Sequence, residues 1–139
     1  MSEGIETTEL SLPSRIDTVA AAAAAVAEFV GRSAISEDAA FGIDMAVREA
    51  VTNAVLHGNR QDDNKTVDIV LKSSPDAVEI SVHDQGPGFN PEAVPDPTEQ
   101  ENILKTSGRG IFFMRTFMDE VDWTIRPGGG TTVRMLKRR

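Results

Sequence analysis

The spacing of hydrophobic residues changes near Gly58, and this change constrains the fold more than any other feature of the sequence. Before it, apolar residues recur at the spacing of an amphipathic helix over residues 37–57. After it, apolar and polar residues alternate over 67–71 and again over 78–82, which is typical of half-buried strands. A Ser-Pro-Asp turn at residues 74–76 is expected to join these two strands.

Two helices are expected before the change in spacing. Ser14 is a predicted N-cap for a first helix that runs through Val30 and is stopped by Gly31. Ser36 is a predicted N-cap for the second helix, and the two acidic residues that follow it suit the positive end of a helix dipole. Gly58 provides the expected C-cap signal at the end of this second helix.

The remaining elements define the fold class. We expect a short strand over 6–12, a short helix over 110–118, and two final strands that contain residues 121–125 and 132–136. Strand pairs and helices segregated in this way predict an α+β fold, a two-layer α/β sandwich with helices on one face of a mixed sheet. Residues 1–139 are expected to form a single domain. The Pro-rich acidic loop, about 90–107, is long enough to be a flexible lid over a binding site.

Composition excludes several classes of function. With 139 residues and 40% hydrophobic content, the chain can form one core. The formal net charge of -8 argues against nucleic-acid binding, and the absence of cysteine removes disulfides and thiolate sites. No segment approaches the roughly 20 apolar residues that span a bilayer, and the alanine run over 20–25 lacks the flanks of a signal peptide. We therefore expect a cytoplasmic protein with no membrane or nucleic-acid partner.

The stretch EAVTNAVLHGN, residues 49–59, places polar side chains on an otherwise apolar helix. Glu49 and Asn53 are four residues apart, so they project within ~40° of each other, away from the main apolar stripe. Solvated residues on the outer side of a helix would give the same pattern. The alternative interpretation is that this pair faces a bound ligand.

Three further clusters have glycine or polar residues at the ends of predicted elements. In VHDQGPGFNP, residues 82–91, Asp84 ends a strand, and the glycines after it open the backbone to a planar ring. In Ser-Gly-Arg-Gly-Ile, residues 107–111, glycines precede a helix, where backbone N–H groups favour phosphate. Gly-Thr-Thr, residues 130–132, begins the last strand. Taken singly, ordinary turns and good strand-forming residues explain these clusters as well or better.

The order of these clusters resembles the GHKL ATP-binding domains shared by gyrase, histidine kinases and MutL. Within them, the chain is most similar to the small anti-sigma-factor serine/threonine kinases of bacteria. The resemblance covers nearly the whole chain and is most specific in EAVTNAVLHGN, DQGPGF and SGRGIFFMRTFMDEV. It implies a Bergerat-type α/β sandwich that holds ATP between the asparagine-bearing helix, the glycine segments and the lid.

The resemblance also implies roles for individual residues. Asn53 matches the residue that coordinates Mg²⁺ at the phosphates, Glu49 the general base that takes the proton from an attacking serine, and Asp84 the carboxylate that reads adenine. The other residues implied in ATP binding are Gly86 and Gly88 at the pocket floor, Gly108, Arg109 and Gly110 near the phosphates, and Thr131 or Thr132 near adenine. The residues left without a firm role are His57, Asn59, Arg60 and Lys105.

The implied function is that of an ATP-dependent serine/threonine kinase and anti-sigma factor. Such a kinase phosphorylates a STAS-domain anti-anti-sigma protein, otherwise holds a sigma factor away from RNA polymerase, and is typically a homodimer. Two alternatives stay open: a non-catalytic ATP-gated binding module that switches partners, and a histidine-kinase-like catalytic subunit that acts on a separate acceptor. The presence of Glu49 favours the kinase over the binding module, which needs no such carboxylate.

Overall fold

The computed structural model describes residues 6–33, 35–58, 64–85, 114–125 and 130–138. Its elements, in chain order, are β1 (Glu6–Pro13), α1 (Thr18–Arg32), α2 (Glu37–Asn53), the π-helical turn η1 (Ala54–Gly58), β2 (Thr66–Ser73), β3 (Ala77–His83), β4 (Glu120–Ile125) and β5 (Thr131–Arg138). Residues 114–117 are also helical. The five expected strands and the two expected long helices are confirmed, in the expected order.

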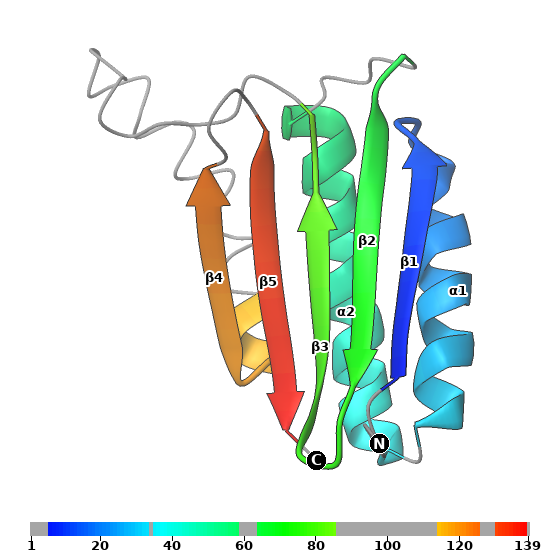
Figure 1. Ribbon diagram of the computed structural model, residues 1–139, viewed down its shortest axis with the longest axis vertical. Coiled ribbons are helices and arrows are strands. Elements are labelled where there is room, and N and C mark those ends of the chain that lie inside the picture. Colours follow the sequence, from blue (N-terminus) through cyan, green and yellow to red (C-terminus); the bar gives the residue numbers. More distant parts are fainter. Residues whose placement is uncertain (1–5, 34, 59–63, 86–113, 126–129, 139) are drawn as a thin grey trace.

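The five strands form one sheet in the order β1-β2-β3-β5-β4, and α1 and α2 cover the same face of it (Figure 1). The two-layer α/β sandwich is thereby confirmed. The expectation of a mixed sheet is wrong, because each pair among the described strands is antiparallel. β3 and β4 do run in the same direction, but β5 folds back beside β4 and inserts between them, so β3 and β4 do not pair.

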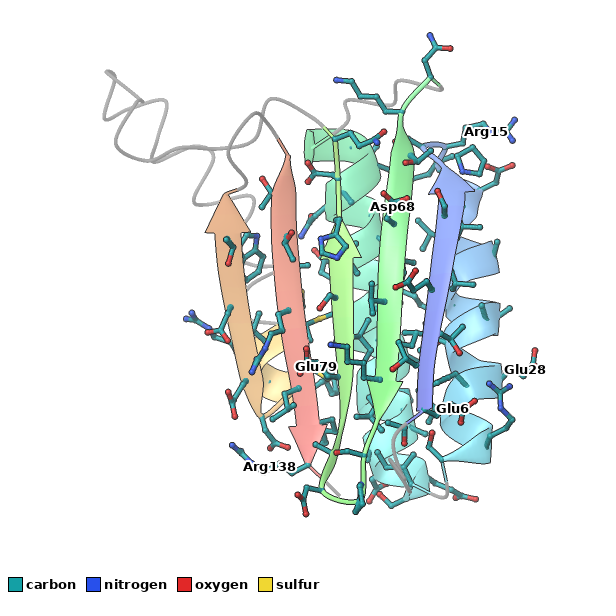
Figure 2. The ribbon with its side chains drawn as sticks, in the orientation of Figure 1. Glu6, Arg15, Glu28, Asp68, Glu79 and Arg138 are labelled. Carbon is teal, nitrogen blue, oxygen red and sulfur yellow. The ribbon has the colours of Figure 1, made fainter. Side chains whose placement is uncertain are left out.

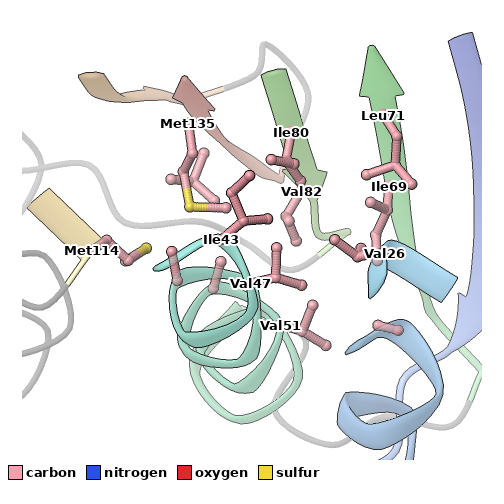
Figure 3. Close-up of a cluster of buried hydrophobic side chains, with 14 of the residues drawn as sticks. Val26, Ile43, Val47, Val51, Ile69, Leu71, Ile80, Val82, Met114 and Met135 are labelled. Atoms are coloured by element: carbon pink, nitrogen blue, oxygen red, sulfur yellow. The ribbon is translucent and has the colours of Figure 1, made fainter. Parts of the chain in front are cut away.

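The hydrophobic core lies between the sheet and the two helices. On β2 and β3, every second side chain is buried, because successive side chains of a strand point to opposite faces. Figure 3 shows these side chains meeting the inner stripe of α2. The labelled residues are Val26, Ile43, Val47, Val51, Ile69, Leu71, Ile80, Val82, Met114 and Met135. Full burial of an aliphatic side chain contributes about 1.5–3 kcal/mol, so this core is the main source of stability.

The other face of the sheet is polar. Asp68 of β2 and Glu79 of β3 lie on it, turned away from the helices (Figure 2). Arg134 of β5 reaches across this face to Glu79 at 3.8 Å and to Asp122 at 3.0 Å. These groups are partly exposed, so their ion pairs add little to the free energy of unfolding. Because these charged groups keep this face hydrated, it does not need to be covered by a second layer of helices.

Helix α2 begins where the sequence predicts. The Ser36 side chain accepts a hydrogen bond from the Ala39 N–H at 3.2 Å, which confirms the expected N-cap. Glu37 and Asp38 occupy the first turn, where the helix dipole favours negative charge. Within the described ranges, neither this helix nor any other is long and apolar enough to cross a membrane.

Helix α1 differs from the prediction at its start. Ser14 is not the N-cap, because Asp17 occupies that position; Ser14 is buried, and its N–H donates to the Lys65 carbonyl at 3.1 Å. This hydrogen bond connects the residue after β1 to the residue before β2. Helix α1 begins four residues after Ser14, at Thr18. A residue whose side chain suits an N-cap can instead be held by a tertiary contact, and Ser14 is held by its bond to Lys65.

Helix α1 also differs at its end. Gly31 lies inside the helix, which continues to Arg32. The Ser33 N–H donates to the Val30 carbonyl at 2.9 Å, and the Ser33 hydroxyl donates to the Phe29 carbonyl at 2.9 Å. These two bonds satisfy two of the last four carbonyl groups of the helix, so the end is set by Ser33 and not by the glycine.

Two helix glycines give different predictions on substitution by alanine. A Cβ on Gly31 would have no atom within 4 Å, so Gly31→Ala should stabilise the fold by about 0.5–1 kcal/mol. A Cβ on Gly42 would lie 3.1 Å from the carbonyl oxygen of Phe117, in the helical segment packed against α2. We expect Gly42→Ala to be less stable than Gly31→Ala by about 1–3 kcal/mol in urea unfolding. Equal stability of the two variants would contradict this close packing.

Candidate functional site

Helix α2 carries Glu49 and Asn53 in its last two turns. Both side chains are half-buried, whereas Ala50 and Val51 between them are buried in the core. Within the described residues, no hydrogen bond or ion pair engages the side chain of Glu49 or Asn53. The pair lies at the border of the core, on neighbouring turns of one helix face, with polar atoms available to a ligand.

Directly after Asn53 the helix changes to the π-helical turn η1. The Ala54 N–H is shared between the Ala50 and Val51 carbonyls at this change. The helix was expected to run to about residue 57 with Gly58 as its C-cap; in the structure Gly58 belongs to the helical segment, whose last turn is π-helical. π-helical turns are rare and are frequently found at functional sites. This turn could not be predicted from the sequence, because the composition of η1 does not distinguish a π-helical turn from an α-helical one.

The buried Asp84 and the half-buried Thr131 form a corner where β3 ends and β5 begins. The Asp84 N–H donates to the Thr131 carbonyl at 2.9 Å, and the Thr131 N–H donates to Asp84 Oδ1 at 3.1 Å. Asp84 is only 7% exposed, which a carboxylate tolerates when it is hydrogen-bonded. The corner lies at the end of the sandwich where η1 also ends (Figure 1).

Gly130 makes this corner possible. Its φ of 95° is in the left-handed region, which favours glycine. A Cβ at this position would overlap with the Asp84 carbonyl oxygen, so a side chain would push the two strands apart. The separate role of Gly130 was not predicted from the sequence. The signal was present as three consecutive glycines, but composition does not tell which of them needs a positive φ.

The two threonines of β5 point to opposite faces of the sheet, since side chains alternate along a strand. Thr132 pairs with His83, and its Oγ1 lies 2.6 Å from His83 Nδ1 on the polar face. Thr131 lies on the same side as Asp84. Of the two threonines that the resemblance implied, only Thr131 is brought together with Asp84.

The other predicted site residues lie outside the described part of the chain. They are Gly86, Gly88, Gly108, Arg109 and Gly110, together with Asn59, Arg60, Lys105 and the lid of residues 90–107. His57 lies in η1, but its side chain also falls outside the description. Among the described residues, no group of three acidic, histidine or cysteine side chains could hold a metal ion. Asn53 supplies one oxygen ligand of the kind that Mg²⁺ accepts.

A buried carboxylate at a strand end, a polar pair at a helix end and a glycine at the strand corner agree with a known family. The sequence profile of the histidine kinase-like ATPase domain matches residues 12–137. The chain belongs to this family.

Two relatives within this family and one solved structure are similar to the chain over much of its length. The chain is 34% identical to the anti-sigma F factor of Geobacillus stearothermophilus over 135 residues, 92% of this chain and 89% of that protein. It is 38% identical to the anti-sigma F factor of Clostridium perfringens over 98 residues, 69% of this chain and 70% of that protein. The crystal structure of the RsbU and RsbW domains of Rv1364c from Mycobacterium tuberculosis matches with a TM-score of 0.70 at 19% identity. That match covers 96% of this chain and 32% of that chain, and it confirms the fold.

Proposed function

We propose that this protein is an ATP-dependent serine/threonine kinase and anti-sigma factor that works in the cytoplasm. The observation that carries the proposal is the placement, at one end of the sandwich, of both the Glu49–Asn53 pair and the Asp84–Thr131 corner (Figure 1). Membership of an ATPase family and similarity to anti-sigma F factors support it.

Adenine would be bound at the corner of Asp84 and Thr131. A carboxylate accepts a hydrogen bond from the exocyclic amine of adenine, and guanine presents an acceptor at the equivalent position. The Asp84 carboxylate is buried, so this hydrogen bond would be largely shielded from water and would discriminate between the two bases. Gly86 and Gly88 are proposed to form the floor of the same pocket.

The phosphates would lie toward the end of α2. Asn53 would hold Mg²⁺ through its side-chain oxygen, with phosphate and water oxygens as the remaining ligands, which is how Mg²⁺ is usually bound. The metal, when bound, neutralises the charge that develops on the phosphates. Gly108, Arg109 and Gly110 are proposed to contact the phosphates through backbone N–H groups and the guanidinium.

Glu49 would act as the general base. It would accept the proton of a serine hydroxyl as the serine oxygen bonds to the γ-phosphorus, the bond to the bridging oxygen breaks, and ADP leaves. Its half-buried position, one turn from Asn53, is suited to this because it is shielded yet reachable. Phosphoryl transfer requires mainly positioning and charge stabilisation, and a single carboxylate suffices as the base.

The proposed acceptor is a serine of a STAS-domain anti-anti-sigma protein, and the competing partner is a sigma factor. In this proposal the kinase acts as a homodimer that holds the sigma factor until the unphosphorylated STAS protein replaces it. Nucleotide shifts the balance only if the ATP and ADP forms differ in partner affinity. The printed names of the relatives support the sigma-factor partner.

The anti-sigma function is tested by measuring binding of the purified protein to each sigma factor of the same organism, with Mg-ATP and then with Mg-ADP. We expect one sigma factor to bind, with an affinity that differs between the two nucleotides. No binding to any sigma factor in either nucleotide would refute the anti-sigma part of the proposal and leave the kinase part to be tested by transfer.

Asp84→Asn should weaken ATP binding about 10–100-fold, the cost of a hydrogen bond to a charged group. The amide oxygen would keep the bond from the Thr131 N–H, and the amide would then present a donor where adenine also presents one. GTP affinity should fall less than ATP affinity, as measured by competition for a fluorescent nucleotide. Asp68→Asn on the polar face is the matched control and should leave both affinities unchanged. Equal ATP and GTP affinities in the wild type would contradict the role of Asp84.

A further inference from the structure

An open pocket of about 400 Å³ lies between α1 and α2. Its walls are mainly apolar and come from the second half of α1, the linker and the first half of α2: Val26, Val30, Ile35, Ala40, Phe41 and Ile43. In Figure 1, these halves of the two helices lie at the end of the sandwich opposite the Asp84–Thr131 corner. The pocket is therefore separate from the proposed nucleotide site.

Two residues make this pocket accessible. Gly31 has no side chain, and an added Cβ would have no atom within 4 Å. The Phe41 side chain is 59% exposed, although its ring contacts Phe117 edge-on with ring centroids 5.9 Å apart. An exposed phenylalanine beside an apolar hollow leaves apolar area in water that a partner protein would cover.

The charge around the pocket is negative. Among the described residues that line it, the charged ones are Glu37 and Asp44, and both are carboxylates. Asp44 is paired with Arg48 at 3.1 Å, whereas no ion pair among the described residues includes Glu37. The chain as a whole has a formal net charge of -8. A partner that fills the pocket should therefore carry positive charge beside its apolar side chains.

We propose that this pocket, lined by α1 and α2, docks a basic amphipathic helix of the sigma factor. The inference rests on the proposed anti-sigma function and assigns the surface that performs it. An amphipathic helix inserts apolar side chains, spaced three and four residues apart, into a hollow between two helices. A sigma factor contacts promoter DNA, so it must carry basic surfaces, and these match the carboxylates at the rim.

The position of the pocket favours the sigma factor over the STAS protein as the occupant. A phospho-acceptor serine must reach Glu49, whereas the pocket faces the first half of α2. From Phe41 to Glu49 the helix rises about 12 Å, and from Asp44, the last residue of α2 that lines the pocket, about 7.5 Å, at 1.5 Å per residue. A helix docked in the pocket leaves the phosphate end of α2 open. The sigma factor can therefore be held while ATP is bound and while the STAS protein approaches.

Filling the pocket tests the proposal. In Gly31→Leu, the new side chain enters open space and replaces a helix glycine, so the fold should be retained. We expect the affinity for the sigma factor bound by the wild type to fall at least tenfold, while ATP affinity and transfer to the STAS protein stay unchanged. Ala21→Leu is the matched control, because Ala21 is exposed on the same helix but does not line the pocket. This variant should bind the sigma factor as the wild type does.

A second variant tests the charge. Glu37→Gln should weaken sigma-factor binding and make its affinity less sensitive to salt, because salt screens the charge pairs at the rim. Wild-type affinity in both Gly31→Leu and Glu37→Gln would overturn the docking site and leave the anti-sigma function intact. Loss of STAS binding alone in Gly31→Leu would also overturn it, by assigning the pocket to the other partner. If the wild type binds no sigma factor, both the docking site and the anti-sigma function are wrong.

Discussion

Replacing Asn53 with alanine should abolish Mg²⁺-dependent ATP binding. Asn53 is the last residue of α2, half-buried, and without a hydrogen-bond partner among the described residues. Loss of groups that support a metal site typically costs 10–100-fold in affinity, and removal of a direct ligand should cost at least about 100-fold. The measurement is a titration of a fluorescent ATP analogue with Mg²⁺ and with EDTA.

The neighbouring threonine provides the control. The Thr52 hydroxyl donates to the Arg48 carbonyl at 2.7 Å within the same helix, so Thr52→Ala removes a local bond only. This variant should bind Mg-ATP with wild-type affinity. If Asn53→Ala binds Mg-ATP as tightly as Thr52→Ala does, Asn53 does not hold the metal, and the assignment of the phosphate end of the site is wrong.

Replacing Glu49 with glutamine should have the second large effect, and it should fall on the chemical step. The substitution keeps the size of the side chain and removes its capacity to accept a proton. General bases contribute about 10²–10⁴-fold to rate, so phosphate transfer should slow by that factor while the dissociation constant for Mg-ATP stays within about twofold. Single-turnover transfer to the STAS protein and nucleotide titration measure the two quantities separately.

Arg48→Ala is a suitable control for Glu49. Arg48 immediately precedes Glu49 in the helix and is exposed, and its ion pair with Asp44 is an ordinary i,i+4 surface pair. Its removal should leave the transfer rate unchanged. A Glu49→Gln variant that transfers phosphate at the wild-type rate would exclude a proton-accepting role for Glu49, even if ATP binding is confirmed.

Much of the fold follows from local sequence signals. The alternation at Val67, Ile69 and Leu71 predicts β2 because each of these side chains must be buried on one face. The Ser36 cap predicts the start of α2 because a side-chain oxygen there satisfies a helix N–H that otherwise lacks a partner. In both cases the interaction that decides the structure lies within a few residues of the signal.

The predictions that were wrong concern features of the structure that are determined by contacts between residues far apart in the sequence. Ser14 has the chemistry of an N-cap, but its backbone is fixed by Lys65, which is 51 positions further along the chain. The sheet is antiparallel because β5 inserts between β3 and β4, and the alternation of a strand does not specify its neighbours. Strand order depends on packing across the whole domain and could not be obtained from periodicity.

In the candidate site, too, features set by local sequence were predicted and features set by long-range packing were not. The spacing of Glu49 and Asn53 predicts that they share a helix face, and the structure places both side chains at the border of the core. The choice between Thr131 and Thr132 required the register of β3 and β5, which sets Thr132 opposite His83. The pocket between α1 and α2 was not predicted, because it depends on how two helices pack against each other.

Transfer of phosphate from Mg-ATP to a partner protein is the measurement that decides the proposed function. The protein is incubated with Mg-ATP and each STAS-domain protein of the same organism, with Glu49→Gln alongside, and intact masses are recorded. We predict one added phosphate on one STAS protein, stable to acid as a serine ester is, and absent with Glu49→Gln. Tight ATP binding without transfer to any STAS protein would contradict the kinase and identify a nucleotide-gated binding module. An acid-labile phosphate would indicate a histidine-linked product instead.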